Sequence, residues 1–319
     1  MKIAFVGKGG SGKTTLSALF VRHLVDQRLP TLALDADINQ HLATALGATD
    51  EQAARLPTLS AHLPLIKNYL RGDNPRIPTP DAMIKTTPPG SGSRLLRVVE
   101  DNPIYTACVR EIDGARLAVT GAFTEDDLGV ACYHAKVGAV ELLLNHLLDG
   151  PGEYVVVDMT AGADSFASGL FTRFDLTALV CEPTLRSVAV YRQYLRYAQD
   201  FDIRIAVIGN KIADTDDLDF LREQVGADLL CWIGRSGHVR ASERGQTRPI
   251  TDLEPANRTA LTTIQSTLDT IERDWVGYQR HAVRFHLRNV AAWAGQRGDD
   301  DLTAQVDPDF VPGLRQVSA

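Results

Sequence analysis

The sequence predicts an α/β protein in which a mostly parallel, twisted sheet is covered by helices on both faces. Short apolar stretches alternate along the chain with segments whose apolar residues recur at helical spacing. Strands that alternate with helices form parallel sheets covered on both faces. Several apolar stretches also end in polar residues, and the carboxyl ends of parallel strands meet at one edge of a sheet, where ligands bind.

The expected strands share a high content of Val, Ile, Leu and Ala. They are KIAFVG (2–7), PTLALDAD (30–37), RLAVTGAF (116–123), YVVVDMTAG (154–162), LTALVCEPT (176–184) and RIAVIGNK (204–211). The expected helices between them include TTLSALFVRHLVDQ (14–27), VGAVELLLNHLLD (137–149) and VAVYRQYLRYAQDF (188–201). Residues 53–110 are less regular, and we expect an insertion there. Its proline- and glycine-rich part, residues 73–94, is expected to be an exposed excursion.

The apolar pattern changes after residue 255. Apolar residues then alternate three- and four-residue steps, which predicts a long helical extension over residues 256–297 that follows a domain of residues 1–255. These apolar residues are Leu261, Ile264, Leu268, Ile271, Trp275, Tyr278, Ala282 and Phe285. The extension either packs on its own domain or contacts a partner or a second subunit. Residues 298–319 are expected to form a flexible tail.

Composition limits the classes of protein that the chain can represent. The net charge of the 319 residues is −7, so nonspecific attraction to nucleic acid or to an anionic membrane is not favoured for the whole molecule. No uncharged apolar run reaches the roughly 18 residues of a membrane span, and Met1 leads directly into the first strand, so no signal peptide is expected. The four cysteines show no disulfide spacing. We therefore expect a cytoplasmic protein.

The stretch GKGGSGKTT between the first strand and the first helix matches the P-loop pattern. Its glycines let backbone N–H groups turn inward around phosphates, and the helix N-terminus adds its positive end. Lys13 is expected to reach the β- and γ-phosphates as a catalytic residue, and the Thr14 hydroxyl to bind Mg²⁺. The sequence therefore predicts a P-loop NTPase fold. The expected nucleotide-binding residues are Gly7, Lys8, Gly9, Gly10, Ser11, Gly12, Lys13, Thr14, Thr15, Asn210 and Lys211.

Two acidic residues at strand ends complete the expected Mg²⁺ and water site. Asp158 is the expected Walker-B carboxylate, which holds Mg²⁺ directly or through water. Asp37 is expected to lie near the γ-phosphate and the metal and to act as a catalytic residue that orients and deprotonates the attacking water. Asn210 and Lys211 close a later strand where the base would lie. Because no NKxD aspartate follows them, ATP is favoured over GTP.

These residues together resemble the deviant Walker A motif of the MinD/ParA-type ATPases, in which an early lysine, here Lys8, is a signature. In that family the lysine reaches across a nucleotide-sandwich dimer to phosphates bound by the other subunit. A second cation at the γ-phosphate acts like an arginine finger on the charge that develops there. The resemblance therefore implies an ATP-dependent homodimer in which Lys8 is catalytic toward the neighbour's ATP.

Further stretches resemble the CooC-type maturation ATPases of nickel carbon-monoxide dehydrogenase. They are MIKTTPPGSGSR, RLAVTGAF, GVACYHAKVGAVELLLNHLL, VVVDMTAGADSFASGLF and VCEPTLRSVAVYRQ. That branch carries a metal-binding Cys-x-Cys pair, whereas the matching positions here are Cys132 and His134. One such pair from each of two subunits would supply an S₂N₂ site for Zn²⁺ or Ni²⁺. The other interpretation is that the metal site is lost.

We therefore expect a Mg²⁺-ATP-dependent, dimerising ATPase that acts as a switch in metallocentre maturation of the nickel-insertion type, with a client metalloenzyme or other protein as its partner. The alternative is a ParA/MinD-type positioning or partner-regulating ATPase that acts on protein, DNA or membrane surfaces without a metal role. A non-hydrolysing interaction module is the third interpretation.

Overall fold

A computed structural model describes residues 1–121, 133–162, 166, 169–292 and 301–313. Its main sheet has eight strands in the order β10-β9-β8-β1-β7-β2-β5-β4, all parallel except the β4–β5 pair. These strands are β1 (Lys2–Gly7), β2 (Thr31–Asp35), β4 (Arg110–Ile112), β5 (Ala115–Val119), β7 (Tyr154–Asp158), β8 (Leu176–Cys181), β9 (Ile205–Ile212) and β10 (Leu229–Gly234). Two short strands, β3 (Leu96–Arg97) and β6 (Leu147–Leu148), form a separate parallel pair. The predicted fold class is confirmed.

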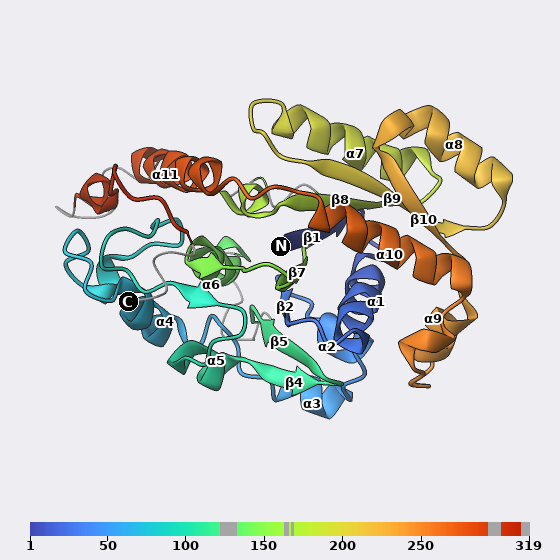
Figure 1. Cartoon of the computed structure of the whole chain (residues 1–319), viewed down its shortest axis with the longest axis horizontal. Helices are drawn as coiled ribbons and strands as arrows, with labels where there is room; N and C mark the ends of the chain where they lie inside the picture. The colour runs from blue at the N-terminus through green and yellow to red at the C-terminus, as the bar shows by residue number, and fades with distance from the viewer. Residues whose placement is uncertain (122–132, 163–165, 167–168, 293–300, 314–319) are drawn as a thin grey trace.

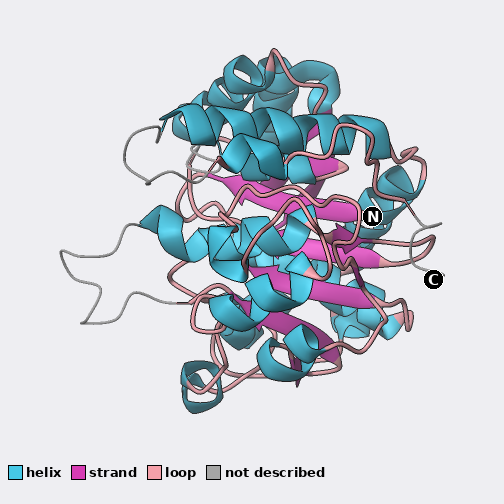
Figure 2. Ribbon diagram, turned by 90° about the vertical axis from the view of Figure 1, so that its left-hand side faces the viewer, coloured by secondary structure: helices cyan, strands magenta, loops and turns pink. Residues whose placement is uncertain are grey.

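Helices cover both faces of this sheet (Figures 1 and 2). They are α1 (Lys13–Asp26), α2 (Leu42–Ala45), α3 (Asp50–Ala54), α4 (Leu63–Arg71), α5 (Pro103–Cys108), α6 (Tyr133–Asn145), α7 (Leu185–Ala198), α8 (Thr215–Val225), α9 (Gly237–Ser242), α10 (Pro255–Asp269) and α11 (Trp275–Ala292). In β1, Ala4 and Val6 join one core, with α4, α6, α7 and α8, while Ile3 and Phe5 join the other, with α1, α2 and α10. This alternation follows from the two-residue period of a strand. Within the described residues no helix is long and apolar enough to cross a membrane.

The strand register places the polar strand ends at one edge. In the hydrogen-bonded ladder Asp158 of β7 lies beside Phe5 of β1 on one side and Asp35 of β2 on the other. Gly7, the last residue of β1, lies beside Val180 of β8. The glycine loop that follows β1 and the carboxylates of β2 and β7 therefore meet, as expected for the carboxyl ends of parallel strands.

The insertion differs from the sequence prediction in its exposure. Residues 73–94 were expected to be exposed, but residues 83–84 and 86–90 are buried, and Met83 and Thr87 are fully so. This stretch lies against α6, where Asn145 donates a hydrogen bond to the carbonyl of Lys85. The Gln279 side chain of α11 donates to the carbonyl of Pro89. Proline and glycine content indicated a loop correctly, but it did not indicate that other segments cover the loop.

The expected long helix over residues 256–297 is two helices, α10 and α11. The first four apolar residues of the predicted seam, from Leu261 to Ile271, pack in the core of this domain. The chain then leaves helical geometry, and Asp274 starts α11 by accepting a hydrogen bond from the N–H of Gly277 at 2.8 Å. Aspartate favours such a capping position over a helix interior, so a polar break divides a continuous apolar pattern.

The flexible tail predicted for residues 298–319 is wrong for residues 301–313, which pack against the insertion. Gln305 is 1% exposed. Its side chain donates to the carbonyl of Ala82 and accepts from the hydroxyl of Thr87, both at 2.8 Å. Asp307 accepts from the N–H of Ser91 at 2.9 Å. These hydrogen bonds satisfy polar groups of the buried loop, which would otherwise be costly to remove from water.

A buried charge cluster joins the first strand to the α10–α11 connection. The ammonium group of Lys2 lies 2.6 Å from Asp149, and these side chains are only 2% and 1% exposed. Arg273, from the connection, lies 2.8 Å from the same carboxylate. The rings of Trp275 and Tyr278 lie 4.7 and 4.8 Å from the Lys2 ammonium. Burial alone would raise the pKa of Asp149, but the neighbouring cations outweigh it and hold that pKa below its usual range.

We predict that Asp149→Asn lowers the free energy of unfolding by about 3 to 5 kcal/mol, because it leaves the charge of Lys2 buried without its counter-ion. Urea denaturation followed by circular dichroism measures this quantity. The control is Asp219→Asn, which breaks an exposed ion pair with Arg222 of similar length and should change stability little. Equal losses of unfolding free energy in the two variants would show that the buried ion pair contributes no more to stability than the exposed one.

Candidate nucleotide-binding site

The loop between β1 and α1 has the backbone geometry of a phosphate cradle. Gly10 and Gly12 have φ angles of +78° and +97°, which side chains other than glycine rarely adopt. A Cβ on Gly12 would also lie 2.2 Å from the Asn210 amide nitrogen, and one on Gly7 would lie 2.5 Å from the Val180 carbonyl oxygen. The glycines are therefore required both by conformation and by the close approach of neighbouring strands.

The two lysines of the loop have different surroundings. Lys13 is 6% exposed, and it lines the cavity described below. Burial lowers the pKa of Lys13, although Asp158 and Asp37 act in the opposite direction. Lys8 is one-third exposed, is not among the cavity-lining residues, and lies 3.5 Å from the carboxylate of Glu182. The Lys8 ammonium also donates to the Gly9 carbonyl at 3.1 Å.

Asp158 is a buried carboxylate with unused hydrogen-bonding capacity. Its Oδ1 accepts a hydrogen bond from Ser17 of α1 at 3.3 Å, whereas its Oδ2 has no partner among the residues that the structure describes. Burial raises the pKa of Asp158 to about 7, although Thr14 and Lys13 oppose that shift. A buried carboxylate with an unpaired oxygen beside a threonine hydroxyl suits a divalent cation, whose charge would compensate its own. These residues therefore fit Mg²⁺.

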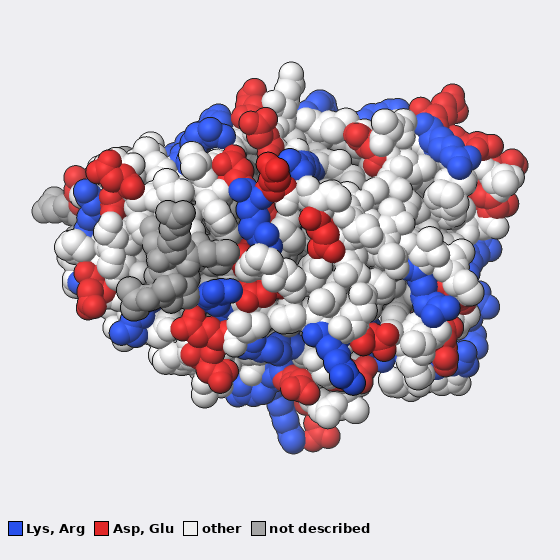
Figure 3. All heavy atoms as spheres, in the orientation of Figure 1, with Lys and Arg blue, Asp and Glu red and all other residues white. Residues whose placement is uncertain are grey.

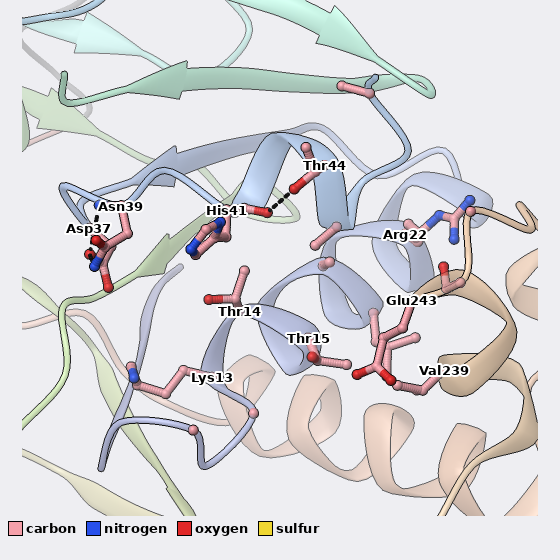
Figure 4. Close-up of a pocket in the computed structure, with 18 of the residues that line it drawn as sticks. Lys13, Thr14, Thr15, Arg22, Asp37, Asn39, His41, Thr44, Val239 and Glu243 are labelled. Atoms are coloured by element: carbon pink, nitrogen blue, oxygen red, sulfur yellow. Dashed lines mark hydrogen bonds between the residues drawn. The ribbon is translucent and has the colours of Figure 1, made fainter. Parts of the chain in front are cut away.

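Asp35 shapes the loop that carries Asp37. It is fully buried, and it accepts hydrogen bonds from the N–H groups of Asp37 at 3.1 Å and Leu42 at 2.9 Å. Burial, followed by the charge of Asp158, raises the pKa of Asp35 well above its usual value. Asp37 itself is partly exposed and accepts two hydrogen bonds from Asn39 (Figure 4). Asp35 thus has a structural role, since its hydrogen bonds hold the loop that places Asp37 on the cavity wall.

A cavity of about 970 Å³ runs from the P-loop along α1. Lys13, Thr14 and Asp37 lie at its phosphate end. Val239 of α9 and Glu243, which directly follows α9, lie at the other end, beside Thr15 and Arg22 (Figure 4). This volume falls in the range of nucleotide-sized ligands. The cavity wall is formed by P-loop residues, by the loop and helices after β2, and by the α9 segment after β10.

The sequence motifs did not identify His41 or the residues of α9 as lining residues. His41 lies close to Thr14 at the phosphate end (Figure 4), and His238, Val239 and Ser242 line the opposite wall. These segments follow the carboxyl ends of β2 and β10. The rule that ligands bind at this edge could have indicated them, although no local motif does.

The two residues predicted to hold the base contact the P-loop in this structure. The amide of Asn210 donates to the Ser11 carbonyl at 2.6 Å. The ammonium of Lys211 donates to the Gly10 carbonyl at 2.6 Å and pairs with Glu182 at 2.8 Å. Lys211 lines the cavity. Their contact with an adenine ring stays a prediction.

The predicted metal pair lies mostly beyond what the structure describes. Cys132 falls outside the described residues, and His134 is described only as part of the α6 backbone. Over the described ranges no group of three or more His, Cys, Asp or Glu side chains is placed to hold a metal ion.

Sequence comparison gives close relatives. The sequence model of the family described as "CobQ/CobB/MinD/ParA nucleotide binding domain" matches residues 3–274. The carbon monoxide dehydrogenase accessory protein CooC of Rhodospirillum rubrum is 32% identical over 260 residues, which are 81% of this chain and 92% of CooC. An uncharacterised ATP-binding protein of Methanocaldococcus jannaschii is 27% identical over 252 residues, which are 76% of this chain and 88% of that protein.

Solved structures share the fold at lower sequence identity. The ParA family ATPase from Chlorobium tepidum aligns with a TM-score of 0.57 and 17% identity over 84% of this chain and 98% of that one. MinD from the MinC:MinD complex of Aquifex aeolicus aligns with a TM-score of 0.55 and 19% identity over 86% of this chain and 97% of that one. The predicted resemblance and the predicted ATPase activity are thereby confirmed. The chain belongs to the CobQ/CobB/MinD/ParA family of nucleotide-binding ATPases.

Proposed function

We propose that this ATPase is a Mg²⁺-ATP-dependent switch that closes as a homodimer and serves the maturation of a metal centre in a client enzyme. The observation that supports a dimer is the position of Lys8. One P-loop lysine, Lys13, lines the cavity, whereas Lys8 lies outside it with a third of its side chain exposed. Lys13 would supply the positive charge at the phosphates of its own subunit, which leaves Lys8 available to phosphates held by a second copy.

The residues of the cavity suit in-line attack of water on the γ-phosphate. Backbone N–H groups of the glycine loop and the ammonium of Lys13 would bind the phosphate oxygens. Thr14 and Asp158 would hold Mg²⁺, and Asp37 is included in that set because it lines the same end of the cavity as Thr14. Mg²⁺ bound there would neutralise charge that develops on the phosphates.

Two groups act on the reacting atoms in this scheme. Asp37 would orient the water and accept its proton, since its carboxylate is on the cavity wall and is held by the loop that Asp35 fixes. Lys8 of the second copy would stabilise the charge on the transferred group. To do so it must leave Glu182, whose carboxylate it shares with Lys211. Once the γ-phosphate has been hydrolysed and released, Lys8 of the second copy would lose its partner, and the two copies could separate.

The maturation role rests on sequence similarity. CooC of R. rubrum, an accessory protein of carbon monoxide dehydrogenase, covers four-fifths of this chain at 32% identity. The Cys132 and His134 pair would supply one thiolate and one imidazole from each copy, which is a donor set for Zn²⁺ or Ni²⁺. Because of this similarity and this donor set, we propose that the client is a metalloenzyme.

One observation favours the alternative of a partner-regulating ATPase without a metal role. Histidine stands at position 134, where the related branch has the second cysteine of its pair. A role on DNA or membranes has less support, because acidic and basic side chains are interspersed over the face shown in Figure 3 and the net charge is −7.

We predict that Lys8→Ala lowers the rate of ATP hydrolysis at least about a hundredfold, because a cation is lost from the transition state, while ATP affinity changes little. Steady-state phosphate release and equilibrium binding of ATP measure the two effects. Lys67→Ala, which removes a lysine from α4 outside the cavity, is the control and should hydrolyse ATP normally. Light scattering should show a dimer with Mg²⁺-ATP. Normal turnover of Lys8→Ala, or a monomer with every nucleotide, would exclude the trans role.

We predict that changing Cys132→Ser together with His134→Ala removes about one bound metal ion per dimer and leaves ATP binding intact, because an S₂N₂ site needs both donors. Elemental analysis of purified protein gives the metal content. Cys108→Ala, a buried thiol of α5, is the control and should retain the metal. A metal-free wild-type protein, or metal that persists in the double variant, would favour the alternative function.

A further inference from the structure

The loop that follows Asp158 is held by three hydrogen bonds, one each to β1, to the first residue of the P-loop and to α7. The N–H of Met159 donates to the Phe5 carbonyl at 3.1 Å, and the N–H of Gly162 donates to the Gly7 carbonyl at 2.9 Å. The carbonyl of Gly162 accepts a hydrogen bond from the hydroxyl of Tyr194 at 3.0 Å. The first two contacts are backbone contacts that any sequence could make. The third depends on one side chain of α7, outside every motif in the sequence.

Gly162 is the point of this loop with the greatest conformational freedom. Its φ angle is +78°, and a Cβ at this position would meet nothing within 4 Å. The surrounding atoms therefore do not restrain it by packing, and hydrogen bonds must do so. Glycine loses more conformational entropy on ordering than any other residue, so an anchor on its carbonyl group has a large effect on the order of the loop.

Tyr194 is itself firmly placed. It is 1% exposed, and its ring packs edge-on against Phe166 with centroids 4.8 Å apart. Phe166 lies 4.3 Å from Phe171, which in turn lies 5.3 Å from Phe285 of α11. The hydroxyl is thus presented to Gly162 from a packed aromatic cluster, which is how a positioning group holds a fixed geometry.

We infer that Tyr194 is a positioning residue for ATP hydrolysis, which fixes the loop of residues 160–162 against the P-loop through the Gly162 carbonyl. Tyr194 is not among the residues that line the cavity. Its effect passes through the loop that connects Asp158 to the phosphate end of the cavity, where Ala161 is a lining residue. This inference rests on the proposed hydrolytic cycle but not on the dimer's client or on a bound transition metal.

The test compares two tyrosine hydroxyls on the same helix. Tyr194→Phe keeps the aromatic packing and removes the hydroxyl that donates to Gly162. Tyr191→Phe is the matched control, because Tyr191 is 5% exposed and its hydroxyl donates to Asp228 at 2.6 Å, away from the cavity. Both variants should lose similar thermal stability.

Single-turnover hydrolysis of saturating Mg²⁺-ATP by the full chain should fall about three- to tenfold in Tyr194→Phe, the range of one neutral hydrogen bond. Its equilibrium affinity for ATP should stay within about twofold, because the phosphate-binding N–H groups are unchanged. Tyr191→Phe should match the wild-type protein in both quantities. This separation of rate from affinity is what a purely structural role would not produce.

Three results would overturn the inference. The first is a normal rate in Tyr194→Phe, and the second is an equal fall in both variants, which would indicate general loosening of α7. In either case the hydrolysis rate of Asp37→Asn, measured in parallel, shows which proposal has failed. A large fall in that rate would mean that the proposed hydrolytic mechanism holds and only the inference on Tyr194 is wrong. The third is a wild-type protein without turnover, which would overturn the proposed function and this inference together.

Discussion

The hydrogen-bonded register of β1, β7 and β2 is the constraint on which the site depends. It sets Asp158 beside Phe5 and Asp35 at the strand ends, while the pairing of β1 with β8 brings the first glycine of the P-loop next to Val180. A shift of one residue in any of these pairs would turn a buried carboxylate to the opposite face of the sheet. Buried Val, Ile, Leu and Ala residues on both faces fix that register, so the chemistry depends on ordinary core packing.

The same edge concentrates groups that are unfavourable in the absence of a ligand. Asp35 and Asp158 are adjacent and buried, and both have raised pKa values, while the ammonium of Lys13 is buried nearby with a lowered one. Charges removed from water need compensation. A magnesium nucleotide carries both signs and could compensate the carboxylates with its metal and the lysine with its phosphates. The energetic cost of this arrangement is thus recovered when the ligand binds.

Local patterns predicted most of the sheet and the P-loop, because each strand and the glycine motif is specified within a few residues. They failed where distant segments meet. Thr87 and Gln305 are 218 residues apart, so no local pattern could show that one covers the other. The part of the cavity wall that α9 forms depends on the order of the strands in the sheet, which no local pattern gives. Asn210 contacts Ser11 across 199 residues, a contact that no local pattern indicates. The roles of the motif residues were predicted from chemistry, whereas their neighbours required the fold.

The packing of residues 301–313 on the insertion has a consequence for how the protein is made. On the ribosome the chain grows from its N-terminus, so the buried loop around Thr87 must wait for Gln305, which is synthesised 218 residues later. At ordinary translation rates this interval is about 10 to 45 s. During this interval the Thr87 hydroxyl and the Ala82 carbonyl lack the hydrogen-bond partner that they have in the folded protein. Nascent chains of this ATPase are therefore expected to keep this loop without its hydrogen bonds to Gln305 until residue 305 has been made.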